Sequence, residues 1–341
     1  MNTILVWKEQ LQIIYAKYST YIEIGMKFLL GILVFGMTNS NIGFMESAAS
    51  KIVTLGLSFL CAFLPMTIMV VSSTVLVLLH LYKLSIAAVA VAALTFFILY
   101  IFFLRFSYNK AWLVLLTAVA FALKVPFVIP VAVGLLATPI TMIPVVCGTV
   151  AYYLLHYVKT YSNTFAAEGI NAIMEITITC AKQIFTGKEM WIMITVIGIS
   201  ILLVYGIRTR FFDHAWKIAS VAGAVIMVVI CITGNIIWNL HISYVFLIVN
   251  GVLAVATGLL LEVLFFAVDY SRTEQLEFED DEYHYYVKAV PKYAVTVPEK
   301  NVKQIVGTET NMDKDNPQEA EDLLLTRSLS KELGIDSSDR E

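Results

Sequence analysis

Hydrophobic residues form long uninterrupted stretches through the first 268 positions of the chain, and polar residues mark where each stretch ends. A helix needs about 20 mostly apolar residues to cross a hydrocarbon core about 30 Å thick. Several stretches have about that length and predict ordinary membrane-spanning helices, preceded by a shorter and weaker first span. The stretches are residues 84–104, 190–207, 218–237 and 242–268, and the weak first span is 24–38.

Two longer stretches contain prolines where a continuous helix would otherwise be expected. Residues 52–82 contain Pro65 and no Asp, Glu, Lys or Arg, and a straight helix of that length would extend about 46 Å. Residues 111–158 contain four prolines and Lys124. Because proline removes a backbone donor and breaks a helix, both stretches are expected to be divided. We expect a break near Pro65, and pieces of about 111–123, 125–137 and 139–158, at least one of them a half-helix or a re-entrant segment.

The two proline-containing stretches also resemble each other. Residues 65–83 and 139–159 both begin Pro-x-Thr, continue through an apolar run that contains Thr-Val, and end Leu-Leu-His-x-x-Lys. An internal duplication and a chance match of apolar segments explain this echo equally well. Broken backbone at membrane depth is tolerated where it is buried in protein or lines a cavity, and paired broken segments in two halves of a chain indicate a transporter's binding site.

These elements predict an all-α integral membrane protein with about eight hydrophobic helical elements, including Pro-broken or re-entrant half-helices. Residues 1–21 carry apolar side chains on one helical stripe and predict an interfacial amphipathic helix. Residues 22–268 form the polytopic membrane domain, in which 161–187 predict an amphipathic connector helix. Residues 269–341 form a tail.

Composition supports a membrane location and divides the chain near residue 268. The 341 residues are 59% hydrophobic and 14% charged, which excludes an ordinary soluble domain. From Asp269 onward there are 18 acidic and 9 basic side chains, a net charge of −9, whereas the preceding part has a net charge of +6. Arg208, Arg210 and Lys217 lie in one loop, and the positive-inside rule predicts that this loop and the acidic tail are cytoplasmic. We expect a multi-pass protein of the plasma membrane.

Ionisable residues and prolines within the apolar stretches are the candidates for a transport path. Lys124 is the only formal charge in residues 111–158, although ending a span and reaching the headgroups is a slightly favoured alternative for it. Glu262 lies in the last apolar element, where it is a path carboxylate, a partner of Lys124 or an ordinary inward-facing polar residue. Histidines at such positions are more often structural than proton carriers. The candidate set is Lys124, Pro126, Pro139, Pro144, Pro65, Glu262, His80 and His156.

Motifs for catalysis and metal binding are missing from the sequence. It contains no GxxxxGK[ST], HExxH or GxSxG pattern. The four cysteines are far apart in apolar segments and are typical of small buried hydrophobes. We therefore expect no enzymatic activity, no metal site, no cofactor and no nucleic-acid partner. The bilayer is the expected environment, and the sequence leaves the oligomeric state open.

The tail contains patterns typical of a docking element. Residues 277–282 are mostly acidic, the alternation in 283–297 predicts an extended strand, and capping and charge patterns predict a terminal helix at 317–333. Such a tail fits a cytosolic protein partner, for which an ATPase is one candidate, and a solvated tail without a partner is the alternative. The docking candidates are Glu279, Asp280, Asp281, Tyr285 and Tyr286.

The run DYSRTEQLEFEDDEYHYYVKAVPK at 269–292, together with DHAWKIA at 213–219, resembles uncharacterised multi-pass membrane proteins of anaerobic Gram-positive bacteria. The resemblance covers about the last third of the chain. It implies a bacterial plasma membrane and transfers no activity. The functional hypothesis is therefore a transporter-like or permease-like protein for a small solute, an ion or a lipid. The alternative is a non-transporting scaffold whose tail recruits a protein.

Overall fold

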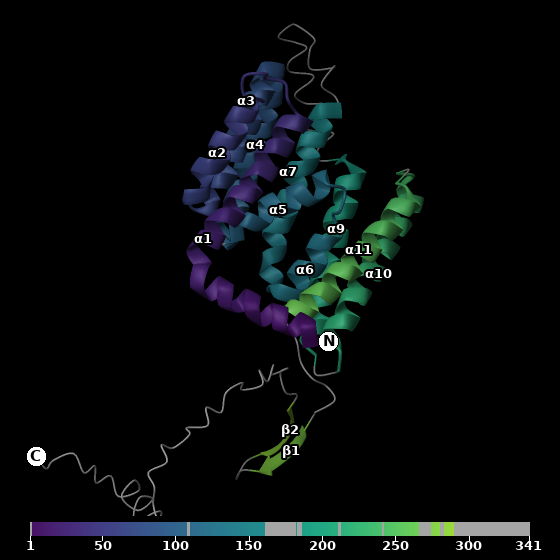
Figure 1. The fold of residues 1–341 in the computed structure, drawn as a ribbon. Helices are drawn as coiled ribbons and strands as arrows, with labels where there is room; N and C mark the ends of the chain where they lie inside the picture. Colours follow the sequence, from purple (N-terminus) through teal and green to yellow (C-terminus); the bar gives the residue numbers. More distant parts are fainter. Residues whose placement is uncertain are drawn as a thin grey trace, which may run out of the picture. The chain divides into compact units, whose positions relative to one another are not determined.

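The computed structural model describes residues 2–107, 110–160, 182, 186–210, 213–240, 242–265, 274–279 and 283–289. Within these residues the chain is mainly α-helical and has one two-stranded antiparallel sheet (Figure 1). The helices pack against one another through clusters of buried hydrophobic side chains. The all-α prediction is thus confirmed for the membrane part of the chain.

The apolar stretches before residue 108 form four helices. Asn39 near the end of the first helix donates to Thr54 near the start of the second (2.8 Å) and contacts His80 near the end of the third (2.9 Å). The second and third helices therefore run in opposite directions and meet at Pro65, which precedes the third helix and confirms the predicted break. The helices are α1 (Asn2–Asn41), α2 (Lys51–Phe63), α3 (Met66–Leu84) and α4 (Ile86–Ser107).

The predicted division of residues 111–158 is also observed. Two short helices come first, of about 18 Å and 14 Å. Each is too short to cross a core of about 30 Å, so both are half-helices. The elements from here on are α5 (Ala111–Ala122), α6 (Val128–Leu136), the 3₁₀ helix η2 (Pro139–Thr141), α7 (Met142–Thr160), α9 (Lys188–Arg208), α10 (Ala215–Trp238) and α11 (Tyr244–Phe265).

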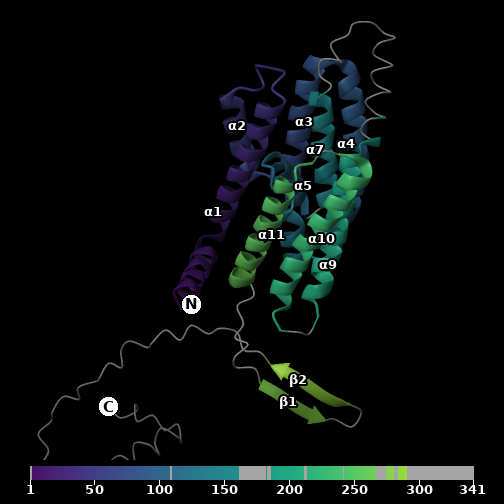
Figure 2. The same ribbon diagram turned by 90° about the vertical axis from the view of Figure 1, so that its right-hand side faces the viewer.

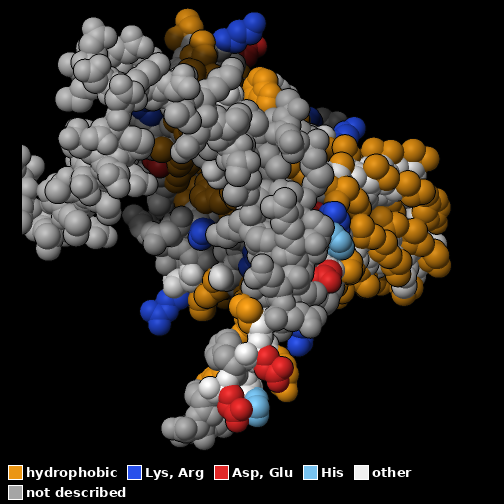
Figure 3. All heavy atoms as spheres, turned by 60° about the horizontal axis from the view of Figure 1, so that its bottom comes forward, with side chains coloured by type: hydrophobic (Ala, Val, Ile, Leu, Met, Phe, Trp, Pro, Cys, Tyr) orange, Lys and Arg blue, Asp and Glu red, His pale blue; other side chains and the backbone are white. Residues whose placement is uncertain are grey.

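Six segments among the described residues are long and apolar enough to cross a bilayer. Their exposed side chains are largely hydrophobic, as expected for a lipid-facing surface, and Figure 3 shows a broad hydrophobic area on the side of α10 and α11. The protein is therefore a multi-pass membrane protein. The six segments are Gln10–Asn41, Met66–Leu84, Pro139–Thr160, Lys188–Arg208, Ala215–Trp238 and Tyr244–Phe265.

The four prolines of the 111–158 stretch lie at the beginnings of helices and not in helix interiors. Pro126 lies in the turn before α6, Pro130 in the first turn of α6, Pro139 at the start of η2 and Pro144 in the first turn of α7. A proline is tolerated in a first turn because its missing N–H would have no helical acceptor there. Pro126, Pro130 and Pro144 are buried, so these breaks are covered by protein and not by lipid.

The chain reverses direction between α5 and α6 at Lys124. Lys124 has a left-handed backbone with φ of 62°. Its N–H donates to the Phe121 carbonyl (3.0 Å), and the Val125 N–H donates to the Ala120 carbonyl (2.8 Å). These two bonds form a Schellman helix end, in which glycine is the usual left-handed residue. Nδ2 of Asn250 in α11 donates to the Lys124 carbonyl (3.1 Å), so the turn is attached to α11.

The half-helix α6 is enclosed by α9, α10 and α11, three helices that lie side by side in Figure 2. A Cβ added to Gly134 of α6 would lie 2.7 Å from Val204 of α9. On the other side, Val131 of α6 lies 3.6 Å from the Cβ position of Gly223 in α10 and 3.2 Å from that of Gly258 in α11. Small residues allow membrane helices to approach this closely, and they account for the burial of α6.

Arg208 at the end of α9 closes the C-terminal end of α6. Its guanidinium donates to the carbonyls of Leu135 and Ala137, the latter at 3.3 Å. The rings of Tyr205 and Trp216 lie 5.3 Å and 5.8 Å from the guanidinium carbon. A cation is favourable at a helix C-terminus, where carbonyl groups lack helical partners. Arg208 therefore has a structural role beyond the topology signal that its sequence position indicates.

The predictions for the N-terminal segment and for the tail agree with the structure only in part, and others lie outside the described residues. α1 (Asn2–Asn41) consists of two helical parts that meet at a kink at Tyr18, where the dihedrals are non-helical, so the kink lies near the predicted end of the amphipathic segment 1–21. Strand β2 (His284–Ala289) lies inside the predicted 283–297 stretch, and its partner β1 (Glu274–Glu279) was not predicted. Almost all of the connector 161–187 and the whole of 317–333 lie outside the described residues.

Candidate functional site: a cavity between α1, α5 and α7

A cavity of about 460 Å³ lies between α1, α5 and α7. Ligand sites in proteins commonly have volumes of about 300–1,000 Å³. Exposed residues at the ends of α1 and α7, among them Asn41 and Lys159, lie at its mouth. The cavity is lined by Val34, Met37, Thr38, Asn41, Ile42, Leu115, Ala118, Val119, Ala122, Tyr152, Leu155, His156, Lys159 and Thr160.

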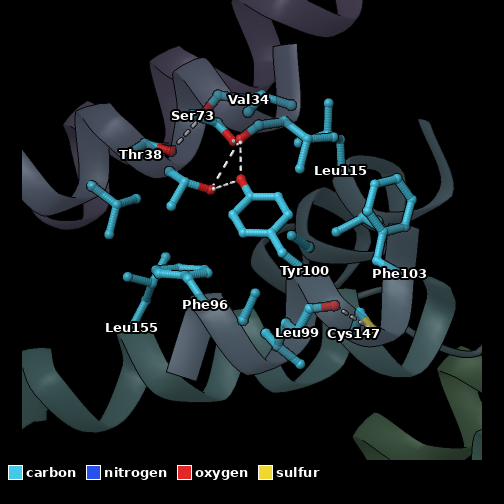
Figure 4. A pocket seen from close by; sticks show the side chains of 16 residues that line it. Val34, Thr38, Ser73, Phe96, Leu99, Tyr100, Phe103, Leu115, Cys147 and Leu155 are labelled. Carbon is cyan, nitrogen blue, oxygen red and sulfur yellow. Dashed lines mark hydrogen bonds between the residues drawn. The ribbon is translucent and has the colours of Figure 1, made fainter. Parts of the chain in front are cut away.

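A second, narrower space of about 80 Å³ adjoins this cavity and extends toward α3 and α4 (Figure 4). Ala118 lines both spaces and therefore lies where they meet. The other residues common to the two linings are Val34, Thr38, Leu115 and Leu155. We call the two spaces together the α1–α5–α7 cavity, with a mouth at Lys159 and an inner end at Tyr100.

The inner end carries hydroxyl groups that already have hydrogen-bond partners. The Tyr100 and Thr74 hydroxyls lie 2.7 Å apart, and both reach the Val70 carbonyl (3.3 Å and 3.0 Å). Ser73 also donates to Val70 (2.8 Å). Figure 4 shows Tyr100 extending into the pocket with its hydroxyl toward the helix that carries Ser73. Because these groups are satisfied by the protein, the inner end does not require a polar ligand.

Among the described residues of the two linings, the one formal charge lies at the mouth. Lys159 is exposed at the end of α7, and His156 lies one turn before it on the same helix face. The His156 ring stacks on Tyr152, with centroids 6.1 Å apart and an interplanar angle of 15°. No Asp or Glu is among the described residues that line either space. The cavity is therefore apolar with a basic mouth.

His80, the counterpart of His156 in the echoed segment, has a different environment. It is fully buried, the Met45 N–H donates to its Nδ1 (3.2 Å), and Nε2 lies 2.9 Å from Oδ1 of Asn39. Since Nδ1 must accept, the proton is on Nε2 and the imidazole is neutral. Asn39 also donates to Ala48 (3.2 Å) and Thr54. His80 thus joins α1, the 42–50 loop, α2 and α3, and it lines neither space of the cavity.

The structure places Lys124 away from the cavity. Its side chain is exposed and lines neither space, and its carbonyl faces Asn250. Asn250 lies six residues after the start of α11 at Tyr244, or about 9 Å along the helix axis. A lysine side chain at that depth can extend to the headgroups. The geometry supports the headgroup interpretation of Lys124, and its role in a path stays a prediction.

The other path candidates are also separated from the cavity. Glu262 is buried in α11, twelve residues after Asn250 and therefore about 18 Å from the level of the Lys124 turn. A Lys124–Glu262 pair, one of the alternatives for Glu262, is consequently not formed. Pro126 and Pro144 are buried in helix packing, and Pro65, Pro139 and Pro144 begin helices. Of the whole path set, only His156 lines the cavity.

The docking candidates fall partly on the β-hairpin. Glu279 at the end of β1 lies 3.2 Å from His284 at the start of β2. Tyr285 and Tyr286 lie on opposite faces of β2 and are both exposed. Asp280 and Asp281 lie outside the described residues. The hairpin therefore presents Glu279 and the two tyrosines to solvent.

Sequence reasoning missed most of the residues that form the cavity. Thr38, Ala118 and Tyr100 are ordinary residues of apolar helices, and nothing in their spacing distinguishes them. Lys159 carried one available signal, since it ends the second echoed segment, three residues after His156.

In the part of the chain that the structure describes, no three His, Cys, Asp or Glu side chains could hold a metal ion together.

Comparison with known proteins finds no matching family model, no similar curated protein and no similar solved structure.

Proposed function

We propose that this protein is a transporter-like or permease-like membrane protein whose substrate occupies the α1–α5–α7 cavity. The observation that carries the proposal is the cavity itself, a space of about 460 Å³ among membrane helices with a mouth at the helix ends. One of its walls is the half-helix α5, and broken helices beside a cavity are typical of secondary transporters. A bacterial plasma membrane and a cytoplasmic tail complete the proposal.

A test of this function does not require the substrate to be known. A transporter exposes its central site to each side of the membrane in turn. We expect a cysteine placed at Ala118, in a chain whose native cysteines are replaced, to react with a membrane-impermeant maleimide added to either face of sealed vesicles. The Ala90→Cys variant is the control, because Ala90 is an exposed residue of α4 outside the cavity lining. Reaction of Ala118→Cys from one face alone would contradict transport and leave a one-sided binding site.

The second candidate function is a membrane scaffold whose tail recruits a protein. The exposed apolar residues Leu276, Tyr285 and Val287 share one face of the β-hairpin by register and favour this alternative. A two-stranded hairpin is only marginally stable alone, so a covering partner would stabilise it. Deletion of residues 270–341 should then leave membrane insertion intact and remove a co-purifying protein. Retention of every co-purifying protein in the truncated form would exclude this function.

A further inference from the structure

We propose that the α1–α5–α7 cavity binds an anionic amphiphile, a molecule with a carboxylate or phosphate headgroup on a single hydrocarbon chain. The headgroup lies at Lys159 and His156, and the chain lies against α5 and extends toward Tyr100. This inference rests on the cavity that the proposed function uses and names the class of molecule bound there.

The charge of the lining residues favours an anionic ligand over a cationic one. Lys159 is the only formally charged residue among the described residues of the two linings, and His156 adds a second donor one helical turn away. A carboxylate or phosphate that receives hydrogen bonds from a lysine forms a charge-assisted interaction, which is stronger than one between neutral groups. Among the described residues of the two linings, a cationic ligand would meet Lys159 and no carboxylate.

The length of the cavity favours a ligand with an extended hydrocarbon chain over a compact solute. Lys159 lies at the mouth and Cys147 lines the inner space, and both belong to α7. Twelve residues separate them, so the cavity follows α7 for about 18 Å. Its inner part has a volume of only about 80 Å³. A cavity that extends this far and ends in a small inner space accommodates an extended hydrocarbon chain.

The walls along this length are mainly apolar, and the hydroxyl of Thr38, which lines both spaces, donates to the Val34 carbonyl (2.8 Å). The residues shared by the two spaces include Leu115, Ala118 and Leu155, and the rings of Phe96 and Phe103 line the inner part (Figure 4). The hydroxyls at the inner end hydrogen-bond to the protein, as described above, so an alkyl chain leaves no buried polar group without a partner. A sugar or a peptide in the same space would lose its hydration without regaining hydrogen bonds.

The small side chain of Ala118 keeps the two spaces connected. A phenylalanine at this position would occupy the junction through which the chain extends. Lys83 provides a matched control for Lys159, because it ends the echoed helix α3, is exposed, and lines neither space. Ala90 provides the corresponding control for Ala118.

The test is photo-labelling of the purified full-length protein in uncharged detergent micelles with a dodecanoate that carries a diazirine near the chain end. We expect the label on residues of the inner space, such as Leu99, Tyr100 and Leu115. Unlabelled dodecanoate and dodecyl phosphate should suppress labelling, whereas dodecanol should compete at least about tenfold less well, which corresponds to about 1.4 kcal/mol. Acetate and inorganic phosphate test a soluble anion as the ligand and should not compete.

Substitutions at two positions of the cavity, each with a control elsewhere in the chain, test the result further. Lys159→Ala should reduce labelling about tenfold, Lys159→Arg should restore it, and Lys83→Ala should leave it unchanged. Ala118→Phe should abolish labelling of the inner residues, whereas Ala90→Phe should not. Equal competition by dodecanol, competition by acetate, or labelling confined to lipid-facing residues would overturn the inference.

Failure of this inference and failure of the proposed function are distinguishable. Labelling of the inner space together with one-sided reaction of Ala118→Cys would show an amphiphile-binding protein that does not transport. Two-sided reaction of Ala118→Cys without dodecanoate labelling would show a transporter for another class of molecule and overturn the inference alone.

Discussion

The segments α2–α3 and α6–α7 share one plan: a short helix, a proline break and a 19-residue helix that ends Leu-Leu-His-x-x-Lys. Their environments differ. α2 packs mainly on α1 and exposes large side chains such as Phe59 and Phe63, whereas α6 is enclosed by α9, α10 and α11. The same local pattern is therefore peripheral in one half of the chain and central in the other.

The two histidines show what this difference does to chemistry. His80 is surrounded by the 42–50 loop and Asn39, which satisfy both ring nitrogens. His156 lies at the same motif position but faces the cavity mouth and is exposed. Neighbouring segments, and not the motif, decide whether the histidine is structural or available to a ligand.

Replacing His80 is the strongest way to test this contrast. His80→Leu leaves the Met45 N–H and Oδ1 of Asn39 without partners in a buried site, and the free energy of unfolding should fall by about 3 kcal/mol. His156→Leu at the exposed position should change it by less than about 0.5 kcal/mol. Denaturant unfolding in detergent micelles measures both. Equal losses for the two variants would remove the distinction between the histidines.

Gly148 tests the close packing of α7 on α5; the equivalent residue of α3 is Ser73, which lines the inner space of the cavity. A Cβ at Gly148 would lie 2.5 Å from the Val114 carbonyl oxygen and 2.8 Å from Thr117 of α5. Gly148→Ala should therefore destabilise the protein by about 2 kcal/mol, as expected for overpacking. Gly56 of α2 has no atom within 4 Å of its Cβ position, and Gly56→Ala should be neutral or stabilising by up to about 1 kcal/mol. Thermal unfolding compares the two, and a neutral Gly148→Ala would show that α5 and α7 can separate.

Arg208 tests whether the burial of α6 depends on its cap. Arg208→Lys keeps the positive charge but loses the fork that reaches both Leu135 and Ala137, and it should cost about 1.5 kcal/mol. Arg210→Lys, in the same loop, should have no measurable effect on unfolding. Protease accessibility and denaturant unfolding provide the measurements. If Arg208→Lys unfolds with the same free energy as the unsubstituted protein, Arg208 acts only as a topology signal.

The smallest expected effect is at the α5–α6 turn. Lys124→Gly removes the strain of a side chain at a φ of 62° and should stabilise the protein by about 0.5 kcal/mol after the entropy of glycine is subtracted. Lys83→Gly, in a helical last turn, should destabilise it instead. Because Lys124 lies outside the cavity lining, neither Lys124→Gly nor Lys124→Ala should change dodecanoate labelling. If both Lys124 variants lose dodecanoate labelling, Lys124 takes part in binding the ligand.

The sequence alone predicted the helices and their breaks in this protein. The break near Pro65 and the division of residues 111–158 match α2–α3 and α5–α6–α7 closely, because proline acts on its own turn of backbone. The apolar stretches that form α9, α10 and α11 were also predicted from the sequence, because the length and hydrophobicity of a stretch are local properties and suffice to predict a membrane-spanning helix.

The tertiary structure alone decided which residues lie together. Lys124 was the most conspicuous residue of the sequence, yet its environment depends on Asn250 in a helix 126 positions away. The cavity depends on side chains from five helices, and ordinary residues such as Ala118 and Tyr100 define it. In a chain so rich in apolar residues, hydrophobicity shows that a helix is in the membrane, but it does not show which of its faces meets lipid, protein or a cavity. That choice follows from helix packing, where glycines, buried hydrogen bonds and the Arg208 cap set the distances between helices.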